Sequence, residues 1–158
     1  MLEFLVSVAM VAGDASPVLP AAAKDRPFNH VSCTGAPNEV RVKLDKVAKS
    51  VGLIVADLYR NDEAGYLKRE GRVQQVRFAA RAPTTEFCMH APKPGEYAVA
   101  LYHDKNANRT LDKGPFGIPA EPFGLSNNPP VRLAAPKIAD TLFEVPAEGV
   151  EVEIQLKG

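Results

Sequence analysis

The polar stretch from His103 to Asp112, HDKNANRTLD, holds the side chains best suited to chemistry in this sequence. Its carboxylates and amides recur two or four residues apart, which gathers many oxygen atoms in one short segment. Oxygen ligands at alternate positions are typical of calcium loops, and a histidine beside carboxylates is typical of acid–base catalysis. Asp and Asn are also common in turns, where they bond their own backbone. The stretch therefore leaves three alternatives: a calcium site, a catalytic cluster or a structural turn.

The calcium alternative aligns the first acid with position 1 of a twelve-residue calcium loop, in which ligands come from positions 1, 3, 5, 7 and 9 and a bidentate Glu from position 12. The candidate metal ligands are then Asp104, Asn106, Asn108, Thr110 and Asp112. However, Arg109 stands where the loop needs glycine, and Pro115 stands where it needs the glutamate. Glu121 would have to complete the shell from further along the chain. We therefore rank calcium, the one cofactor considered, behind the structural turn.

The catalytic alternative pairs His103 with Asp112 and Glu121, because a histidine and a carboxylate can transfer protons together. His103 belongs to the same strand face as apolar residues, which favours a histidine at the edge of the core. The three histidines lack zinc-ligand spacing, and Ser126 lacks the glycine pattern of a nucleophile elbow. We predict no catalytic residues and favour a protein without enzyme activity, with a hydrolase as the alternative. The residues expected to organise the loop or bind a ligand are His103, Asp104, Asn106, Asn108, Asp112, Glu121, Ser126 and Asn127.

Alternating apolar and polar residues predict the strands that position this loop. The stretch EVRVKLDKV places Val40, Val42 and Leu44 on one face, and VEVEIQLK repeats the pattern near the C-terminus. The other predicted strands are GLIVADLYR, RVQQVRFAAR, TTEFCMHA, GEYAVALYHD and TLFEV, while AKSVG and PAEGV are predicted hairpin connections. About seven strands without a helical segment predict an all-β fold, an antiparallel β-sandwich of immunoglobulin-like or transthyretin-like kind.

A long loop rich in proline and glycine, residues 105–138, interrupts this pattern. Its six prolines reduce the entropy lost when the loop is held in one shape. It also carries Phe116, Ile118, Phe123 and Leu125, which we expect to pack against the sandwich. We therefore predict an ordered loop.

Composition excludes some classes of partner. The 158 residues have a formal net charge of zero, and their Lys and Arg are scattered along the chain. Nucleic-acid binding needs a basic stripe, and electrostatic binding to anionic membranes needs a basic cluster. We expect neither partner.

The N-terminal region predicts export. An apolar run, FLVSVAMVA, too short to span a bilayer, precedes small residues that suit signal-peptide cleavage, although the usual basic leader is missing. We expect a signal peptide at 1–23, an irregular lead at 24–38 and one β-sandwich domain at 39–158. The mature chain would have no membrane span and a periplasmic or secreted location.

Two cysteines, Cys33 and Cys88, agree with this location. An even number of cysteines in an exported protein favours a disulfide, with Cα atoms about 4.4–6.8 Å apart. The alternative is a nucleophilic Cys88, because His90 lies two residues away and shares its face of the strand. The disulfide accounts for both cysteines, so we favour it.

The sequence PGEYAVALYHDKNANRTLD, followed by GIPAEPFGLSNNP, resembles a bacterial family known as domain of unknown function 2141. The resemblance extends from about Val40 to Leu156. It implies an exported β-sandwich with no established activity. The family commonly has glycine at the positions of Ala107 and Arg109, and glycine is the residue that best supplies a positive φ. This departure weakens the calcium interpretation.

The function predicted overall is a non-catalytic exported module for binding or structural support. Tyr102, Phe116 and Phe123 offer an apolar patch for a glycan, peptide or protein ligand. The alternative is that these rings hold the loop against the sheet.

Overall fold

A computed structural model describes residues 32–132 and 134–158. The predicted signal peptide at 1–23 lies outside this range. The described chain is all-β, as predicted, with eight strands and three short 3-10 turns. The strands are β1 (Glu39–Asp45), β2 (Leu53–Arg60), β3 (Arg72–Ala79), β4 (Thr85–His90), β5 (Gly95–Asp104), β6 (Phe123–Leu125), β7 (Phe143–Val145) and β8 (Val150–Gln155). The turns are η1 (Arg69–Gly71), η2 (Pro115–Gly117) and η3 (Ile138–Asp140).

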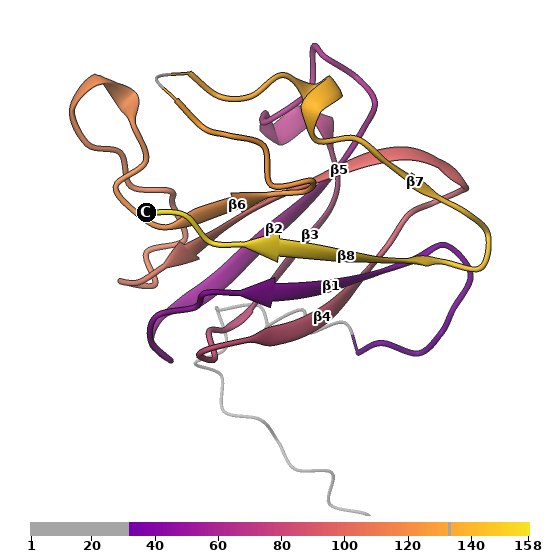
Figure 1. Cartoon of the computed structure of the whole chain (residues 1–158), viewed down its shortest axis with the longest axis horizontal. Helices are drawn as coiled ribbons and strands as arrows, with labels where there is room; N and C mark the ends of the chain where they lie inside the picture. The colour runs from indigo at the N-terminus through magenta and orange to yellow at the C-terminus, as the bar shows by residue number, and fades with distance from the viewer. Residues whose placement is uncertain (1–31, 133) are drawn as a thin grey trace, which may run out of the picture.

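The strands form two sheets that face each other (Figure 1). One sheet has the order β4-β1-β8, and the other has the order β3-β2-β5-β6, with β7 also paired to β5. The pairing of β1 with β8 is parallel, whereas β1–β4, β2–β3, β2–β5, β5–β6 and β5–β7 are antiparallel. The predicted antiparallel sandwich therefore contains one parallel pair.

The core lies between the two sheets and follows the predicted alternation. Val40, Val42 and Leu44 of β1 are fully buried, and Ile154 of β8 packs beside them in the same apolar cluster. The facing sheet supplies Ile54, Ala56, Leu58, Val76, Phe78, Tyr97, Val99 and Leu101. At about 25 cal/mol per Å² of apolar surface removed from water, this burial is the main stabilising contribution to the fold.

Neither predicted hairpin is present. The segment 46–52 carries the chain from β1 in one sheet to β2 in the other, and 146–149 likewise leads from β7 across to β8. In the first connection Val47 is buried, and the positive φ of Gly52 lets the backbone approach Asp104 closely: a Cβ at Gly52 would stand 2.0 Å from the Asp104 carbonyl oxygen. The two hairpin predictions were wrong, because the alternation of apolar and polar residues identifies a strand but not the strand with which it pairs.

The eighth strand, β6, lies inside the predicted long loop. Phe123–Leu125 pairs with the Ala100–Tyr102 part of β5, so the loop is tied to the sheet edge by a backbone ladder. Gly124 lies where the two sheets approach closely, because a Cβ there would stand 2.6 Å from Cγ2 of Ile154. The loop is therefore ordered through strand pairing as well as through its prolines.

Candidate functional site

Asp104 ends β5 and organises the segment that follows it. Its side chain is fully buried. Oδ1 accepts the backbone N–H of Asn108 at 3.1 Å, and Oδ2 accepts that of Arg109 at 2.7 Å. These are charge-assisted bonds to donors that no strand ladder satisfies. The carboxylate therefore closes the turn of residues 104–109 upon itself.

Glu121, further along the chain, binds both ends of the segment 105–112. It is also buried, with Oε1 accepting the N–H of Lys105 at 2.8 Å and Oε2 accepting the N–H of Asp112 at 3.2 Å. The carboxylate of Asp112 in turn accepts hydrogen bonds from Nδ2 of Asn106 at 2.7 Å and from Nδ2 of Asn108 at 2.9 Å. The side-chain oxygens of the stretch thus form a connected network of hydrogen bonds.

The amide side chains complete local turns. Oδ1 of Asn106 accepts the N–H of Asn108, and Oδ1 of Asn108 accepts the N–H of the exposed Thr110. Both are bonds to a residue two positions ahead, which is the pattern of Asx turns. An ion bound at the predicted metal ligands would compete with these donors for the same oxygens.

His103 is separate from this network. It is fully buried on the core side of β5, and its Nε2 lies 2.7 Å from the carbonyl oxygen of Val51 in the β1–β2 connection. We expected His103 at the edge of the core, and it instead lies fully buried against the backbone of the segment 46–52. In the described part of the chain, no group of three or more metal-binding side chains contains His103, Asp104, Asp112 or Glu121.

Ser126 and Asn127 bind backbone across the end of the sheet. Oγ of Ser126 accepts the N–H of Val99 at 3.0 Å and donates to the carbonyl oxygen of Thr141. Nδ2 of Asn127 donates to the carbonyl oxygen of Leu142 at 2.7 Å. Both side chains therefore satisfy backbone groups of β5 and of residues 141–142.

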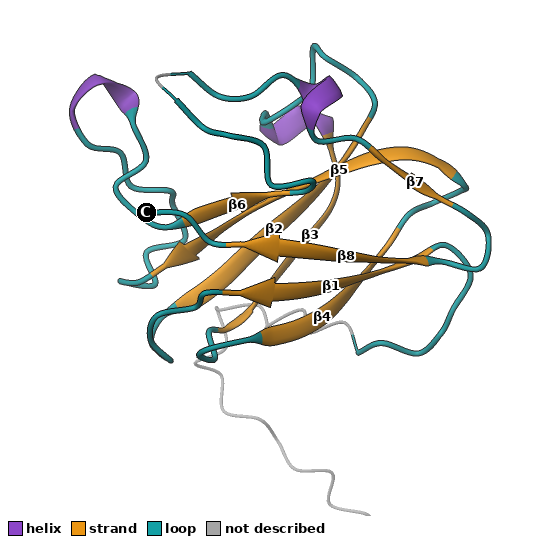
Figure 2. Cartoon of the chain, viewed as in Figure 1, coloured by secondary structure: helices purple, strands orange, loops and turns teal. Residues whose placement is uncertain are grey.

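The tip of the long loop differs from the prediction. Phe116 is fully exposed at 101% of its reference area, and Ile118 is 45% exposed. Figure 2 shows this segment, with its helical turn η2, standing away from the strands. It is braced by backbone bonds from Gly114 N–H to the Ile118 carbonyl and from Ala120 N–H to the Asp112 carbonyl, each 2.8 Å. Only Phe123 and Leu125 of the four predicted contacts reach the sheet, because β6 draws them there.

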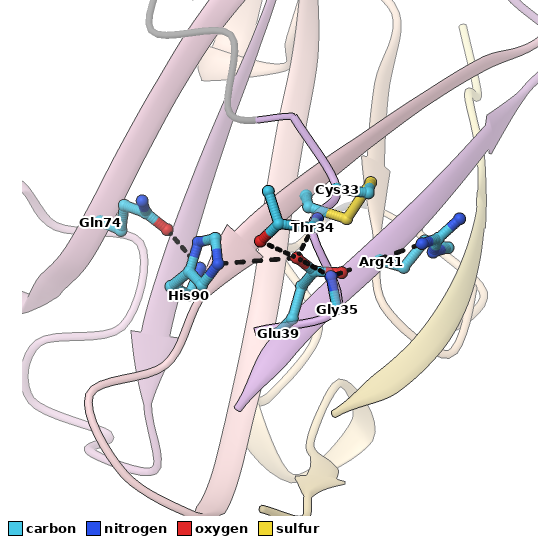
Figure 3. Close-up of a disulfide and its surroundings, with 8 residues drawn as sticks. Cys33, Thr34, Gly35, Glu39, Arg41, Gln74 and His90 are labelled. Atoms are coloured by element: carbon cyan, nitrogen blue, oxygen red, sulfur yellow. Dashed lines mark hydrogen bonds and ion pairs between the residues drawn. A yellow bond between two sulfur atoms is a disulfide. The ribbon is translucent and has the colours of Figure 1, made fainter. Parts of the chain in front are cut away.

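Cys33 and Cys88 form the predicted disulfide, with Cα atoms 5.0 Å apart. Beside it lies Glu39, a buried carboxylate that the sequence prediction missed (Figure 3). Oε2 of Glu39 accepts the N–H of Thr34 at 2.7 Å and that of Gly35 at 3.1 Å. The bond from Thr34 is the main cause that lowers the pKa of Glu39, against the opposing effect of burial.

Two basic side chains flank the Glu39 carboxylate. Nε2 of His90 lies 3.6 Å from Oε2, and a guanidinium nitrogen of Arg41 lies 3.9 Å from Oε1. Figure 3 shows them on opposite sides of the carboxylate. Glu39 and His90 are cross-strand partners in the β1–β4 register, so the sheet itself fixes this arrangement.

Comparison with known proteins gives one match. The family model described as "Uncharacterized protein conserved in bacteria (DUF2141)" matches residues 42–153. The chain belongs to the DUF2141 family. No curated protein and no solved structure matches it.

The DUF2141 match includes the loop of residues 104–121 and β4, but it begins after Cys33 and Glu39. The disulfide therefore joins a segment outside the matched region to a strand inside it. Over the described residues, no helix has the length and apolar character needed to cross a membrane.

A second polar cluster in this DUF2141 chain also escaped prediction. Asp57 of β2 is buried on the face of its sheet that points away from the core. Arg72 Nε lies 3.0 Å from its Oδ2, and Gln75 donates to its Oδ1 at 2.7 Å. Burial is the largest influence and raises the pKa of Asp57 despite the nearby arginine. The sequence signal that could have revealed this cluster is the single carboxylate, Asp57, within the mainly apolar stretch GLIVADLYR.

Tyr59 forms the edge of this cluster. Its hydroxyl lies 3.4 Å from Oδ2 of Asp57, and its ring meets that of Tyr66 edge-on, with centroids 5.6 Å apart. Burial, followed by the charge of Asp57, raises the pKa of Tyr59 to about 12. The contact between the two rings ties the segment 61–71 to the outer face of the sheet, and the ion pair joins β2 to β3.

Proposed function

We propose that the protein is an exported, non-catalytic module whose role is binding or structural support. The observation that carries the proposal is the state of the loop acids: Asp104 and Glu121 are buried, and each accepts two backbone N–H groups. A catalytic acid or base needs access to the proton that it transfers. Carboxylates that bind backbone on both oxygens instead favour a scaffold that holds a long loop in one shape.

The proposed location, periplasmic or secreted, rests on the disulfide between Cys33 and Cys88. Disulfides form and persist in oxidising compartments and are rare in the cytosol. The apolar N-terminal run agrees with this location.

Thermal melting with and without calcium tests the role of the loop acids. We expect Asp104→Ala and Glu121→Ala each to lose about 1–3 kcal/mol, because each leaves two backbone donors without a partner. The loss should be the same in calcium and in chelator, and wild type should melt at the same temperature in both. Glu63→Ala is the control, since Glu63 is an exposed acid of another loop.

The same experiment distinguishes the two alternatives. If chelator destabilises wild type to the level of Asp104→Ala, the acids act through a bound ion and the module binds calcium. If Asp112→Asn or Glu121→Gln abolishes a hydrolytic activity of the wild-type protein while the melting temperature stays unchanged, the hydrolase alternative replaces our proposal.

The binding role is supported by the exposed tip of the loop. Phe116 has a left-handed backbone, with φ of 64°, which is unfavourable for a bulky residue and is typical of functional positions. We propose that this ring enters an apolar pocket of a protein partner. A photo-crosslinking residue at position 116 should then give a discrete product in intact cells, whereas the same residue at exposed Glu148 should not. The same crosslinked products at both positions would contradict the binding role.

A further inference from the structure

The disulfide forms one side of a cluster of metal-binding atoms. Across residues 32–132 and 134–158, the only group of three or more metal-binding side chains comprises Cys33, Glu39 and Cys88, whose ligand atoms all lie within 4.8 Å of one another. This group lies on the opposite sheet from the loop of residues 104–121. It is therefore independent of the calcium alternative.

His90 adds a fourth donor from the same strand as Cys88. The two residues are two positions apart on β4 and so share its outer face, and His90 is the cross-strand partner of Glu39. Nε2 of His90 and Oε2 of Glu39 are 3.6 Å apart. In Figure 3 the carboxylate of Glu39 lies between the imidazole of His90 and the disulfide.

We propose that reduction of the Cys33–Cys88 bond turns this cluster into a tetrahedral Zn²⁺ site formed by Cys33, Cys88, Glu39 and His90. A dithiol reductant supplies two electrons and two protons, breaks the S–S bond, leaves two thiols and itself becomes a disulfide. Zn²⁺ then binds both sulfurs as thiolates, and the two thiol protons pass to solvent. A newly exported chain that has not yet been oxidised reaches the same state without a reductant.

The distances suit this ion. In a tetrahedral site with Zn–S bonds of about 2.3 Å and Zn–N or Zn–O bonds of about 2.0–2.2 Å, neighbouring ligand atoms lie roughly 3.3–3.8 Å apart. The Glu39–His90 separation of 3.6 Å already falls in this range. The sulfurs must separate and the imidazole of His90 must move toward them, since His90 lies outside the group of ligand atoms within 4.8 Å of one another. Rotations of the partly exposed side chains of Cys33 and His90 allow both changes. Two thiolates, one imidazole and one carboxylate are a donor set that zinc prefers over calcium or magnesium.

The surroundings hold the carboxylate in place. The N–H groups of Thr34 and Gly35 bond Oε2 of Glu39 at 2.7 Å and 3.1 Å and fix it beside the two cysteines. The guanidinium of Arg41 repels a dication, but its side chain is 42% exposed and can turn into solvent. The two thiolates and the carboxylate then place three negative charges around one Zn²⁺.

Metal titration of the reduced protein tests the proposal. The full chain is reduced with tris(carboxyethyl)phosphine, freed of metal and titrated without oxygen, first with Co²⁺ as a spectroscopic probe and then with Zn²⁺ against a coloured chelator. We expect one equivalent to bind, with the visible bands of tetrahedral cobalt and a thiolate charge-transfer band. The oxidised protein should show neither.

Variants assign the ligands. Cys88→Ser should reduce the charge-transfer band, because only one thiolate then remains. His90→Ala and Glu39→Gln should each weaken zinc binding by about tenfold or more, since even outer partners of a metal site have effects of that size. Glu86→Gln is the matched control, because Glu86 is exposed on the same face of β4. Its affinity should equal that of wild type.

Two results would overturn the proposal. One is a reduced wild type that binds Zn²⁺ no more tightly than Cys88→Ser. The other applies if reduction unfolds the chain: circular dichroism and melting should then show that Zn²⁺ restores the fold, and failure of Zn²⁺ to do so would exclude the site.

Discussion

Ala107 and Arg109 occupy left-handed backbone conformations, with φ of 57° and 66°. The turn closed by Asp104 places positive φ at both positions, a conformation that glycine adopts without a steric cost. The turn keeps its shape without glycine because the carboxylate and amide bonds over-determine it. A non-glycine residue in this conformation costs roughly 1–2 kcal/mol.

We expect Ala107→Gly to stabilise the protein. Relief of the left-handed strain exceeds the extra chain entropy that glycine gains when unfolded, so the net gain should be about 0.5–1 kcal/mol in urea unfolding. Ala147→Gly is the control, because Ala147 is equally exposed in a turn but does not have positive φ. A loss of stability at both positions would mean that the turn is not strained.

Glu39 predicts a dependence of stability on pH. Its pKa is lowered from 4.5 by hydrogen bonds to Thr34 and Gly35 in the folded state. A depressed carboxyl pKa contributes stability that is present above the unfolded pKa and is lost as the pH falls through the folded value. Glu39→Gln should therefore be less stable than wild type at neutral pH, and the difference should shrink well below pH 4.5.

Urea unfolding of both proteins across this range measures the difference, with exposed Glu86→Gln as the control. A difference that stays constant from neutral to acid pH would show that the folded carboxylate gains nothing from its charge.

The elements meet at β5, which pairs with β2 along one edge and with β6 and β7 along the other. Its inner face carries Val99 and Leu101 into the core, and its last residues, His103 and Asp104, hold two different loops. Strand β6 depends on this edge and on close contact with β8 through Gly124.

We expect Gly124→Ala to destabilise the protein by about 1–3 kcal/mol, the usual effect of overpacking. The added Cβ would lie 2.6 Å from Cγ2 of Ile154 and 3.2 Å from Cδ1 of Leu101, so both sheets would have to shift. Gly114→Ala is the control: its φ is −83° and the nearest atom to an added Cβ, the Ile118 carbonyl oxygen, is 3.7 Å away. Thermal melting compares them, and equal melting temperatures would mean that the sheets yield freely at Gly124.

Over the whole molecule, the disulfide links the lead segment to the sandwich. It joins residues separated by 55 positions. In the chain-entropy model a bridge of this length stabilises the folded state by about 4 kcal/mol, because it restricts the unfolded chain.

Reduced protein and Cys33→Ser should therefore unfold at lower urea concentration than oxidised wild type, by amounts that correspond to this loss. The measurements are made in chelator, so that metal binding does not restore stability to the reduced form. An unchanged midpoint would show that the lead segment adds nothing to the cooperative fold.

The sequence by itself determined the features that depend on neighbouring residues. Period-two alternation identified the strands around Val40 and Ile154, because successive side chains of a strand point to opposite faces. The spacing of Asp104, Asn106 and Asn108 indicated local turns, since these side chains are short enough to reach only nearby backbone. The pairing of the two cysteines followed from their number.

Only the tertiary structure decided which distant segments meet. The parallel pairing of β1 with β8 joins strands at opposite ends of the domain, and nothing in either alternation specifies that partner. The same holds for His103 and the Val51 carbonyl, and for Asp57 and Arg72. Phe116 looked like a core residue by type, but its exposure depends on where β6 begins and how far the loop projects. Such contacts arise from the packing of two sheets, a property of the folded chain as a whole.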